Sequence, residues 1–310
     1  MPPERIAEAL RDLLREMGIS IHHVSFAIPF NSSLLSVVEF PDVGKKQLDT
    51  MIPLEARKYI PVPLNEVLLD WLIIPKRKGD IVPNTVTNIQ TPYIGKIEVI
   101  LVAIHKEVIK KYEIIKKEIN LASAPSHFEI EIFATLRSVV GSDPDPLMII
   151  DIGVASTKLI VVDEGTVRGS HVVSMGGQDI TFALSKSLGI SFNKAEQMKC
   201  RVGMEGEEEG RDIATVADLI TSNIMNEAMR FISNYESKHN IKISKVILVG
   251  GGSRLKGLGK LVSQGFKNKE VLFGNPFARV DTPAFLSATL KEIGQDFSVA
   301  LGVAMKGLDE

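Results

Sequence analysis

Apolar positions near the start of the chain follow helical spacing and then strand spacing. Residues 3–17 repeat apolar side chains every three or four positions with charged residues between them, which predicts an amphipathic helix ending at Gly18. The apolar run from His23 to Ile28 predicts a buried strand, and Pro29 with the polar residues after it predicts a turn. The chain is therefore expected to open with a helix that leads into a strand.

The next elements predict a small independent α+β unit. A polar stretch between its middle strands, residues 75–92, predicts a hairpin loop. The basic tip of that loop, Lys76-Arg77-Lys78, is either a solvated tip or a contact for a partner. The predicted elements are strand Leu34 to Phe40, helix Gly44 to Tyr59, strand Glu66 to Ile74, strand Lys96 to Ile104 and helix Lys106 to Asn120.

A second domain is expected after a helix from Glu129 to Val139. The segment Gly141 to Pro146 is rich in turn residues that neither a helix nor a strand can cross, and it predicts the boundary. Beyond it, a hairpin of strands is followed by helices, a strand, a glycine-rich turn and a helix, which predicts an α/β domain with a ligand crevice at its strand ends. The predicted strands are Leu147 to Ile152, Thr157 to Asp163, Val167 to Ser174 and Lys245 to Val249.

Composition narrows the function classes. The 310 residues are 45% hydrophobic, enough for two or more folding units. Cys200 is the single cysteine, which excludes an intramolecular disulfide and a metal site built from cysteines, and a reducing cytosol fits best. Basic and acidic residues nearly balance at 36 and 38, so no general basic field is present to hold nucleic acid. No apolar run is long enough to span a membrane.

The first candidate motif is the hairpin tip from Asp151 to Lys158. A tip of this kind can direct backbone N–H groups and the hydroxyls of Ser156 and Thr157 at phosphate oxygens, while Gly153 allows close approach. Asp151 at the strand end would hold Mg²⁺ through water, because Mg²⁺ keeps several waters and takes few carboxylates. The alternative interpretation is an ordinary β-hairpin with a polar tip.

Two further motifs lie on the helices that follow. Gly176 and Gly177 come after a strand and before a helix, where consecutive glycines expose N–H groups to an anion. A tight strand-to-helix turn is the alternative. Glu196 and Lys199 lie three positions apart and share one helix face, so they are either ligand-binding residues or a surface ion pair.

The fourth motif follows the strand that ends at Val249. Glycines at 250, 251 and 252, followed by Ser253, allow a flat base and ribose to lie against the backbone, which side chains would block. Each of the four motifs is expected at the carboxyl end of a strand or on the helix after it. Their common position predicts that they meet around one ligand.

The order of these motifs resembles the actin-like ATPase superfamily. That resemblance implies an α/β, actin-like (ribonuclease H-like) two-domain fold that binds ATP or ADP with Mg²⁺. The residues it implies for the nucleotide are Asp151, Gly153, Ser156, Thr157, Lys158, Gly176, Gly177, Glu196, Lys199, Gly250, Gly251, Gly252 and Ser253, with Asp151 also serving the metal.

The first half of the chain narrows the resemblance to one family. The segment Glu55 to Pro63 reads E-A-R-K-Y-I-P-V-P and resembles a signature of the type IV pilus assembly PilM family. Residues 129–137 and 297–308 resemble that family as well. Its insert is shared with the cell-division protein FtsA. FtsA-like proteins usually end in an amphipathic membrane helix, whereas this sequence stops at Glu310, which favours PilM.

The resemblance implies three parts. Residues 1–33, with 121–142 and the C-terminal helix 296–308, would form a first actin-like domain that lacks some strands. Residues 34–120 would form the α+β insert, an SHS2 or 1C-like subdomain of the FtsA/PilM type. Residues 143–295 would form the second actin-like domain with the nucleotide motifs.

One departure from the superfamily concerns the first domain. The fold normally begins with a second phosphate hairpin, yet none precedes Ile21, and Asp42-Val43-Gly44 lies in the wrong place for it. With half of the phosphate clamp absent, hydrolysis is expected to be slow or absent, so the chain is at most a weak ATPase. Glu129 and Glu131 either orient water or act as cap and first-turn carboxylates of their helix.

The expected function is a cytosolic scaffold of the type IV pilus, or a related type II secretion system, at the inner membrane. By resemblance, its partners are the cytoplasmic tail of a PilN-like membrane protein and other pilus assembly proteins, without nucleic acid or direct membrane insertion. That tail would lie in a groove near Tyr59 to Pro63, unless these residues only stop a helix and pack into the insert. The alternatives are an FtsA-like division scaffold and a small-molecule kinase of the superfamily.

Overall fold

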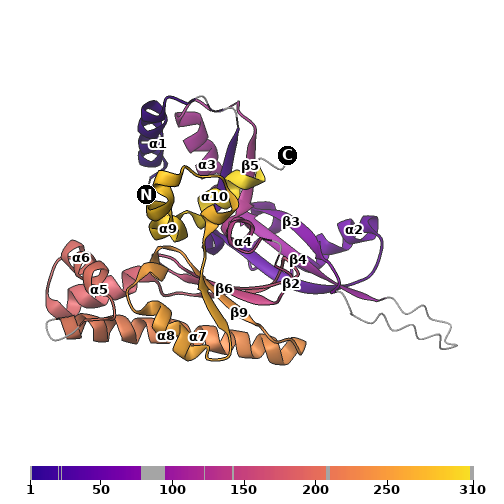
Figure 1. Ribbon diagram of the computed structural model, residues 1–310. Coiled ribbons are helices and arrows are strands. Elements are labelled where there is room, and N and C mark those ends of the chain that lie inside the picture. Colours follow the sequence, from indigo (N-terminus) through magenta and orange to yellow (C-terminus); the bar gives the residue numbers. More distant parts are fainter. Residues whose placement is uncertain are drawn as a thin grey trace. The chain divides into compact units, whose positions relative to one another are not determined.

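The computed structural model describes residues 2–19, 21, 23–77, 95–121, 123–141, 143–206 and 210–307. The chain divides into two compact units, a first unit of Met1–Glu131 and a second unit of Ile132–Glu310 (Figure 1). Most of the predicted 75–92 loop lies outside the described residues, as does Lys78. At the start of that loop, Lys76 forms an ion pair of 2.8 Å with Asp42.

The first unit contains two small sheets and three helices among its described residues. The predicted helices and most of the predicted strands are confirmed, with ends shifted by a few residues. The elements are α1 (Pro3–Met17), β1 (Val24–Ile28), η1 (Phe30–Ser32), β2 (Ser33–Pro41), α2 (Lys45–Ala56), η2 (Leu64–Glu66), β3 (Val67–Ile74), β4 (Lys96–His105), α3 (Lys106–Glu118) and β5 (Ser126–Ile130).

A three-stranded antiparallel sheet, in the order β2-β4-β3, carries α2 on one face. Leu48 and Ile52 of α2 are fully buried against alternate residues of the strands, because apolar side chains that alternate along a strand all point to one face. Ile60, just after α2, is buried in the same core. This core holds the Tyr59 to Pro63 segment against the sheet.

The second small sheet pairs β1 with β5 in parallel. Phe26 and Phe128 stack across it with ring centroids 5.4 Å apart, and Tyr112 of α3 packs on Phe26. The strand β5 was missed by the sequence analysis, and the prediction that Glu129 begins a helix is wrong. Glu129 belongs to β5, and α4 (Glu131–Val139) starts two residues later.

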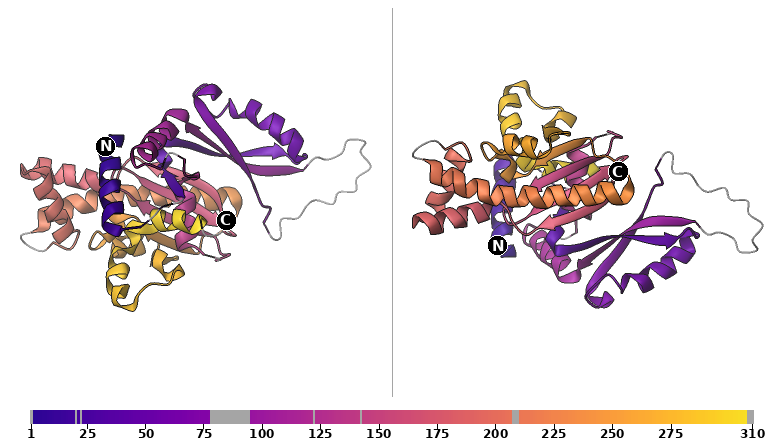
Figure 2. Two further views of the ribbon diagram at one scale, coloured as in Figure 1. Left: turned by 90° about the horizontal axis from the view of Figure 1, so that it is seen from above. Right: turned by 90° about the horizontal axis from the view of Figure 1, so that it is seen from below.

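The second unit is built on a five-stranded sheet in the order β10-β9-β6-β7-β8. Figure 2 shows the long helix α7 lying along one face of this sheet. The elements after α4 are β6 (Leu147–Ile152), β7 (Thr157–Asp163), β8 (Thr166–Val173), α5 (Gly177–Leu188), α6 (Phe192–Val202), α7 (Arg211–His239), β9 (Lys245–Val249), η4 (Gly251–Arg254), α8 (Leu258–Gly265), β10 (Glu270–Phe273), η5 (Pro276–Arg279), η6 (Ala284–Leu286), α9 (Ser287–Ile293), η7 (Gly294–Phe297) and α10 (Ser298–Lys306).

The central strand β6 is buried along its whole length. Met148 and Ile150 pack with Ile224 and Ala228 of α7, while the alternate residues Leu147 and Ile149 face the other side and are also fully buried. A strand buried on both faces reads as a continuous apolar run, which is why the sequence predicted β6 with its observed ends. Asp151 is the polar residue at the end of that run, so the fold carries its carboxylate to the edge of the core.

Helices α4 and α10 of the second unit are in close contact. The Ser138 hydroxyl donates to the carbonyl of Ser298 at 2.7 Å, and Arg137 donates to the carbonyl of Gly302 at 2.7 Å. The expected grouping of residues 121–142 with 296–308 as one domain stays a prediction, as do the other two domain ranges. In the part of the chain that the structure describes, no helix is long and apolar enough to cross a membrane.

Candidate functional site

A cavity of about 950 Å³ opens in the second unit, between the β6–β7 hairpin, the start of α5, α6 and the turn after β9. This volume lies in the upper part of the range of small-molecule sites, roughly 300–1,000 Å³. The predicted site residues that line it are Gly153, Gly176, Gly177, Glu196, Lys199, Gly251, Gly252 and Ser253. Asp151, Ser156, Thr157, Lys158 and Gly250 are outside the lining.

The hairpin tip and the start of α5 are joined by backbone hydrogen bonds. Gly177 and Gln178 donate their N–H groups to the carbonyls of Gly153 and Val154, each at 2.9 Å, and the N–H of Gly176 donates to Asp179 at 2.7 Å. In this state the N–H groups of Gly176 and Gly177 are therefore bonded within the protein, and whether they bind an anion stays a prediction. A phosphate would first have to displace the hairpin carbonyls.

Close packing explains why residue 176 is glycine. A Cβ added there would lie 2.5 Å from the carbonyl oxygen of Val154 and 2.6 Å from that of Gly153, which is well inside van der Waals contact. The glycine lets the backbone of the turn press directly on the hairpin tip. Its first role is thus to couple α5 to the β6–β7 hairpin.

The glycine turn after β9 is fixed in the same manner. Gly250 has φ of +81°, and a Cβ on it would collide with the Asp151 carboxylate. A Cβ on Gly252 would collide with the Ile152 side chain. These glycines are thus required for the contact of the turn with the end of β6, and the prediction that they make room for a base stays a prediction. Ser253 is buried and its hydroxyl donates to the carbonyl of Gly250 at 2.7 Å.

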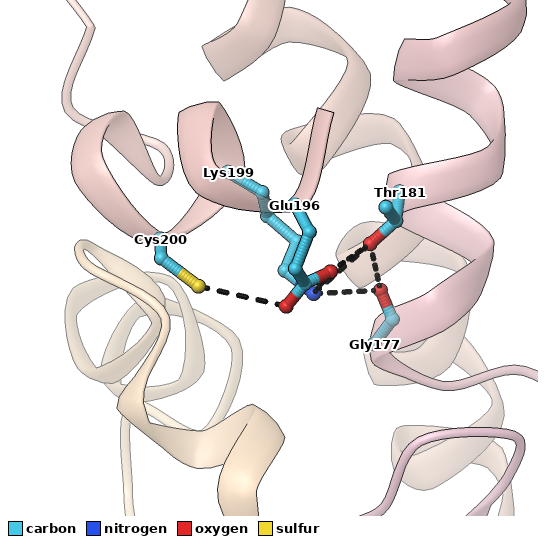
Figure 3. Close-up of polar contacts among 5 residues, drawn as sticks. All are labelled: Gly177, Thr181, Glu196, Lys199 and Cys200. Atoms are coloured by element: carbon cyan, nitrogen blue, oxygen red, sulfur yellow. Dashed lines mark hydrogen bonds and ion pairs between the residues drawn. The ribbon is translucent and has the colours of Figure 1, made fainter. Parts of the chain in front are cut away.

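A polar cluster joins α6 to the first turn of α5 (Figure 3). The Lys199 ammonium donates to the Glu196 carboxylate at 2.8 Å, and to Gly177 and Thr181 at 3.1 Å each. The Thr181 hydroxyl donates to the same Glu196 oxygen at 2.5 Å. The Lys199 side chain is only 12% exposed, so the pair is more enclosed than an ordinary surface ion pair.

Electrostatics around Glu196 favour its charged form. Burial raises the pKa of this carboxyl, but the hydrogen bonds from Lys199 and Thr181 lower it by more, so the net pKa lies below its ordinary value. The Cys200 thiol donates to the other carboxylate oxygen at 3.5 Å. Burial and the neighbouring Glu196 charge raise the pKa of that thiol, which keeps it protonated at neutral pH.

Thr157 is fully buried and points its hydroxyl at the protein rather than at the cavity. Its Oγ1 donates to the carbonyl of Met175 at 2.9 Å, which ties the start of β7 to the strand end before Gly176. Ser156 is buried as well. In this state the Thr157 hydroxyl, which was predicted to face phosphate, supports the hairpin itself.

A family model described as type IV pilus assembly protein PilM matches residues 2–308. The chain belongs to the PilM family. The solved structure of a "PilM-PilN type IV pilus biogenesis complex" has a TM-score of 0.80 and 23% identity to this PilM-family chain, covering 98% of it and 85% of the solved chain. The fold is accordingly of the actin-like class.

More distant matches include a cell division protein and a solved structure of MreB5. The cell division protein FtsA of Neisseria meningitidis serogroup B (strain ATCC BAA-335 / MC58) is 27% identical over 244 residues. That match covers 74% of this PilM-family chain but only 58% of FtsA. The structure of MreB5 of Spiroplasma citri bound to ADP has 15% identity and a TM-score of 0.49, covering 65% of each chain.

Several cavity residues of this PilM-family chain were not predicted. Cys200 lies one turn after Glu196 on α6, a spacing that placed it on the same helix face. Arg254 lines the cavity and pairs with Asp296 at 2.7 Å. Asp296 comes from η7, far along the chain, and no local pattern signals it. The other unpredicted polar lining residues are Gln178, Thr221, Lys256, Glu292 and Gln295.

Charged groups on the cavity wall balance one another. The cations Lys199, Arg254 and Lys256 share the wall with the carboxylates Glu196, Glu292 and Asp296. Lys199 pairs with Glu196, and Arg254 pairs with Asp296 at 2.7 Å and with Glu292 at 3.8 Å. The wall is therefore close to neutral, with apolar surface from Ile152, Ile180, Ile224, Phe192 and Phe273. This composition suits a flat, partly apolar group better than a bare polyanion.

Proposed function

We propose that this chain is a nucleotide-binding scaffold of the type IV pilus assembly platform, or of a related type II secretion platform, at the inner membrane. The observation that carries the proposal is the match of the PilM family model to residues 2–308. The cavity supports it, because motifs from four separate segments of the second unit meet around one space of nucleotide size. Scaffolding, with at most weak ATP hydrolysis, is the activity we assign.

The adenosine part of ATP or ADP is placed between α6 and the glycine turn. Gly251 and Gly252 leave room for a flat group on one wall, and Phe192 offers an aromatic surface. Glu196 lies on the same helix as Phe192 and supplies an acceptor for a ribose hydroxyl, while Lys199 holds that carboxylate in place. The phosphates would lie toward Gly153 and Gly176, where the hairpin and α5 would have to separate to release N–H donors.

Nucleotide binding is tested by calorimetry with ADP and ATP and by alkylation of Cys200. Cys200 is the single thiol of the chain and lines the cavity, so a bound nucleotide should slow its reaction with N-ethylmaleimide. Lys199→Met should weaken binding about tenfold or more, since it removes the ammonium that holds the Glu196 carboxylate and Thr181 in place on the cavity wall. The matched control is Lys194→Met on the exposed side of the same helix. Equal loss in both variants would refute the assignment.

The partner we propose is the cytoplasmic tail of a PilN-like membrane protein, docked beside Tyr59 to Pro63. A solved relative is described as a PilM-PilN complex, which is what suggests this class of partner. In the first unit, Ile60 is buried in the α2 core while the Tyr59 side chain is 42% exposed. Ile60 thus anchors the segment in the core of the insert, while Tyr59 stays accessible to a partner. The segment can therefore end α2 and also dock a partner.

Fluorescence anisotropy with a labelled PilN-like tail peptide from the same genome tests this partner. Tyr59→Ala together with Pro61→Ala should weaken binding about tenfold, because an exposed aromatic anchor and a rigid turn are both removed. Leu54→Ala, an exposed apolar residue of α2, serves as the control and should leave binding unchanged. Sedimentation with bare liposomes completes the test, since recruitment is expected only through the partner. Strong binding to liposomes alone would contradict it.

A further inference from the structure

The predicted magnesium ligand, Asp151, is already held by a cation of the chain itself. Asp151 on β6 and Lys158 on β7 are directly opposite each other in the antiparallel pair, so their side chains lie on the same face of the hairpin. The Lys158 ammonium is 3.3 Å from Asp151 Oδ2. Both side chains are nearly enclosed, 12% and 7% exposed. The ion pair is thus built into the strand register rather than formed by a mobile surface lysine.

The second oxygen of Asp151 is enclosed as well. The space beside Oδ1 is occupied by the backbone of Gly250, where even an added Cβ would collide with that oxygen. Mg²⁺ demands near-octahedral coordination at about 2.0–2.1 Å and keeps several waters. Asp151 offers neither a free face nor space for those waters. Its surroundings therefore do not fit the predicted magnesium site.

No neighbouring group compensates for this misfit. Among the residues that the structure describes, no three His, Cys, Asp or Glu side chains gather to hold a metal ion. Separating the pair to admit a metal would break an ion pair between two enclosed side chains, and breaking such a pair is destabilising. The lysine is thus favoured over a divalent cation at Asp151.

The ammonium lies next to the cavity. A Cβ added to Gly153, which lines the cavity, would be 3.4 Å from Lys158 Nζ, so only the glycine backbone separates the charge from the proposed phosphate position. Without Lys158, the Asp151 carboxylate would repel an anionic ligand there. With it, the carboxylate is neutralised at short range.

We infer that Lys158 replaces the divalent cation at this site, so that the chain binds adenine nucleotides without requiring Mg²⁺. The inference rests on the proposed nucleotide binding for its ligand, but its statement about Asp151 concerns the protein alone. It assigns Lys158 the role of a resident counter-ion and explains why a nucleotide-binding scaffold of this type need not turn over ATP, since phosphoryl transfer depends on bridging metal ions.

Two measurements test the inference separately. Titration of the free protein with Mn²⁺, followed by electron paramagnetic resonance, should detect no site that depends on Asp151. Calorimetry with ADP should give affinities in Mg²⁺ and in EDTA within about twofold for the unchanged protein, and a loss in EDTA of about tenfold or more for Lys158→Met.

A control variant and a double variant accompany the two measurements. Lys245→Met breaks an ion pair with Asp143 elsewhere in the second unit and should change neither measurement. If Lys158→Met folds poorly, Asp151→Asn combined with Lys158→Met provides a neutral pair that should bind ADP equally in both buffers.

Two outcomes would overturn the inference. One is Mn²⁺ binding by the unchanged protein that is lost in Asp151→Asn, and the other is a tenfold loss of ADP affinity of the unchanged protein in EDTA. Absence of ADP binding in both buffers would count against the proposed function, and the Mn²⁺ arm would still decide the role of Lys158.

Discussion

Gly302 marks the closest approach of two helices in the second unit. A Cβ at this position of α10 would overlap the carbonyl of Ala134 on α4. We predict that Gly302→Ala lowers the free energy of unfolding by about 1–3 kcal/mol, although alanine is the better helix former by about 1 kcal/mol, because the backbones must separate. Urea denaturation measures the change. Gly307→Ala is the control, since a Cβ there meets only the Ala304 oxygen at 3.5 Å, and a loss as large in that variant would contradict the explanation.

Glu196 should make the junction of α5 and α6 sensitive to acid. Its pKa in the folded protein is lowered, so it contributes stability that is present above its unfolded pKa and is lost as the pH falls through the folded value. Between about pH 6 and pH 3, the unchanged protein should lose more free energy of unfolding than Glu196→Gln. Because this side chain is 41% exposed, the difference should be small and should shrink with added salt. Parallel slopes for the two proteins would exclude the effect.

At the scale of elements, α1 depends on α3 for its place in the first unit. Ala7 of α1 packs on Ile115 and Ile119 of α3, and all three are buried. Ile115→Ala should cost about 2–5 kcal/mol and speed hydrogen exchange of the α1 amides. The next residue, Ile114, is 45% exposed on the same helix, so Ile114→Ala should change the stability by about 0.5 kcal/mol or less. Unchanged exchange in α1 after Ile115→Ala would show that other contacts hold it.

The strands of the second unit were predicted well because their pattern is local. The runs at 147–152 and 157–163 each have four consecutive apolar residues, Leu147 to Ile150 and Leu159 to Val162, and are bounded by polar turns, and β6 and β7 have those same bounds. In contrast, β5 reads S-H-F-E-I, a mixed segment that continues without a break into α4. Its strand character comes from parallel pairing with β1, about a hundred residues earlier, and local periodicity carries no sign of such a partner.

The candidate site was predicted only in part for the same reason. Motifs with fixed spacing placed Gly176, Glu196 and Lys199 on the correct elements, and the cavity contains all three. The donors and acceptors that those groups use could not be predicted, because they depend on how closely the hairpin tip approaches α5. Whether the predicted residues hold a nucleotide stays a prediction.

At the scale of the whole molecule, the two proposed ligands bind to different units. The cavity belongs to residues 132–310 and the Tyr59 to Pro63 segment to residues 1–131. Hydrogen exchange with ADP should therefore slow amides of the second unit, above all in α5, α6 and the turn after β9, whereas the partner peptide should slow amides around Tyr59. Each ligand alone should leave the other segment unchanged. Protection of the same amides by both ligands would contradict separate sites.

The junction of α4 with α10 also has a consequence for the time course of folding. Ser138 bonds to a residue 160 positions later, and Arg137 to one 165 positions later. Contacts this distant in sequence require loop closure before they stabilise anything, and they slow folding. During synthesis, α4 is translated long before α10, whose residues cover it. Its apolar side therefore stays exposed to solvent while the strands of the second unit are being translated. We therefore expect chaperones to bind α4 on the nascent chain until the residues of α10 have been translated.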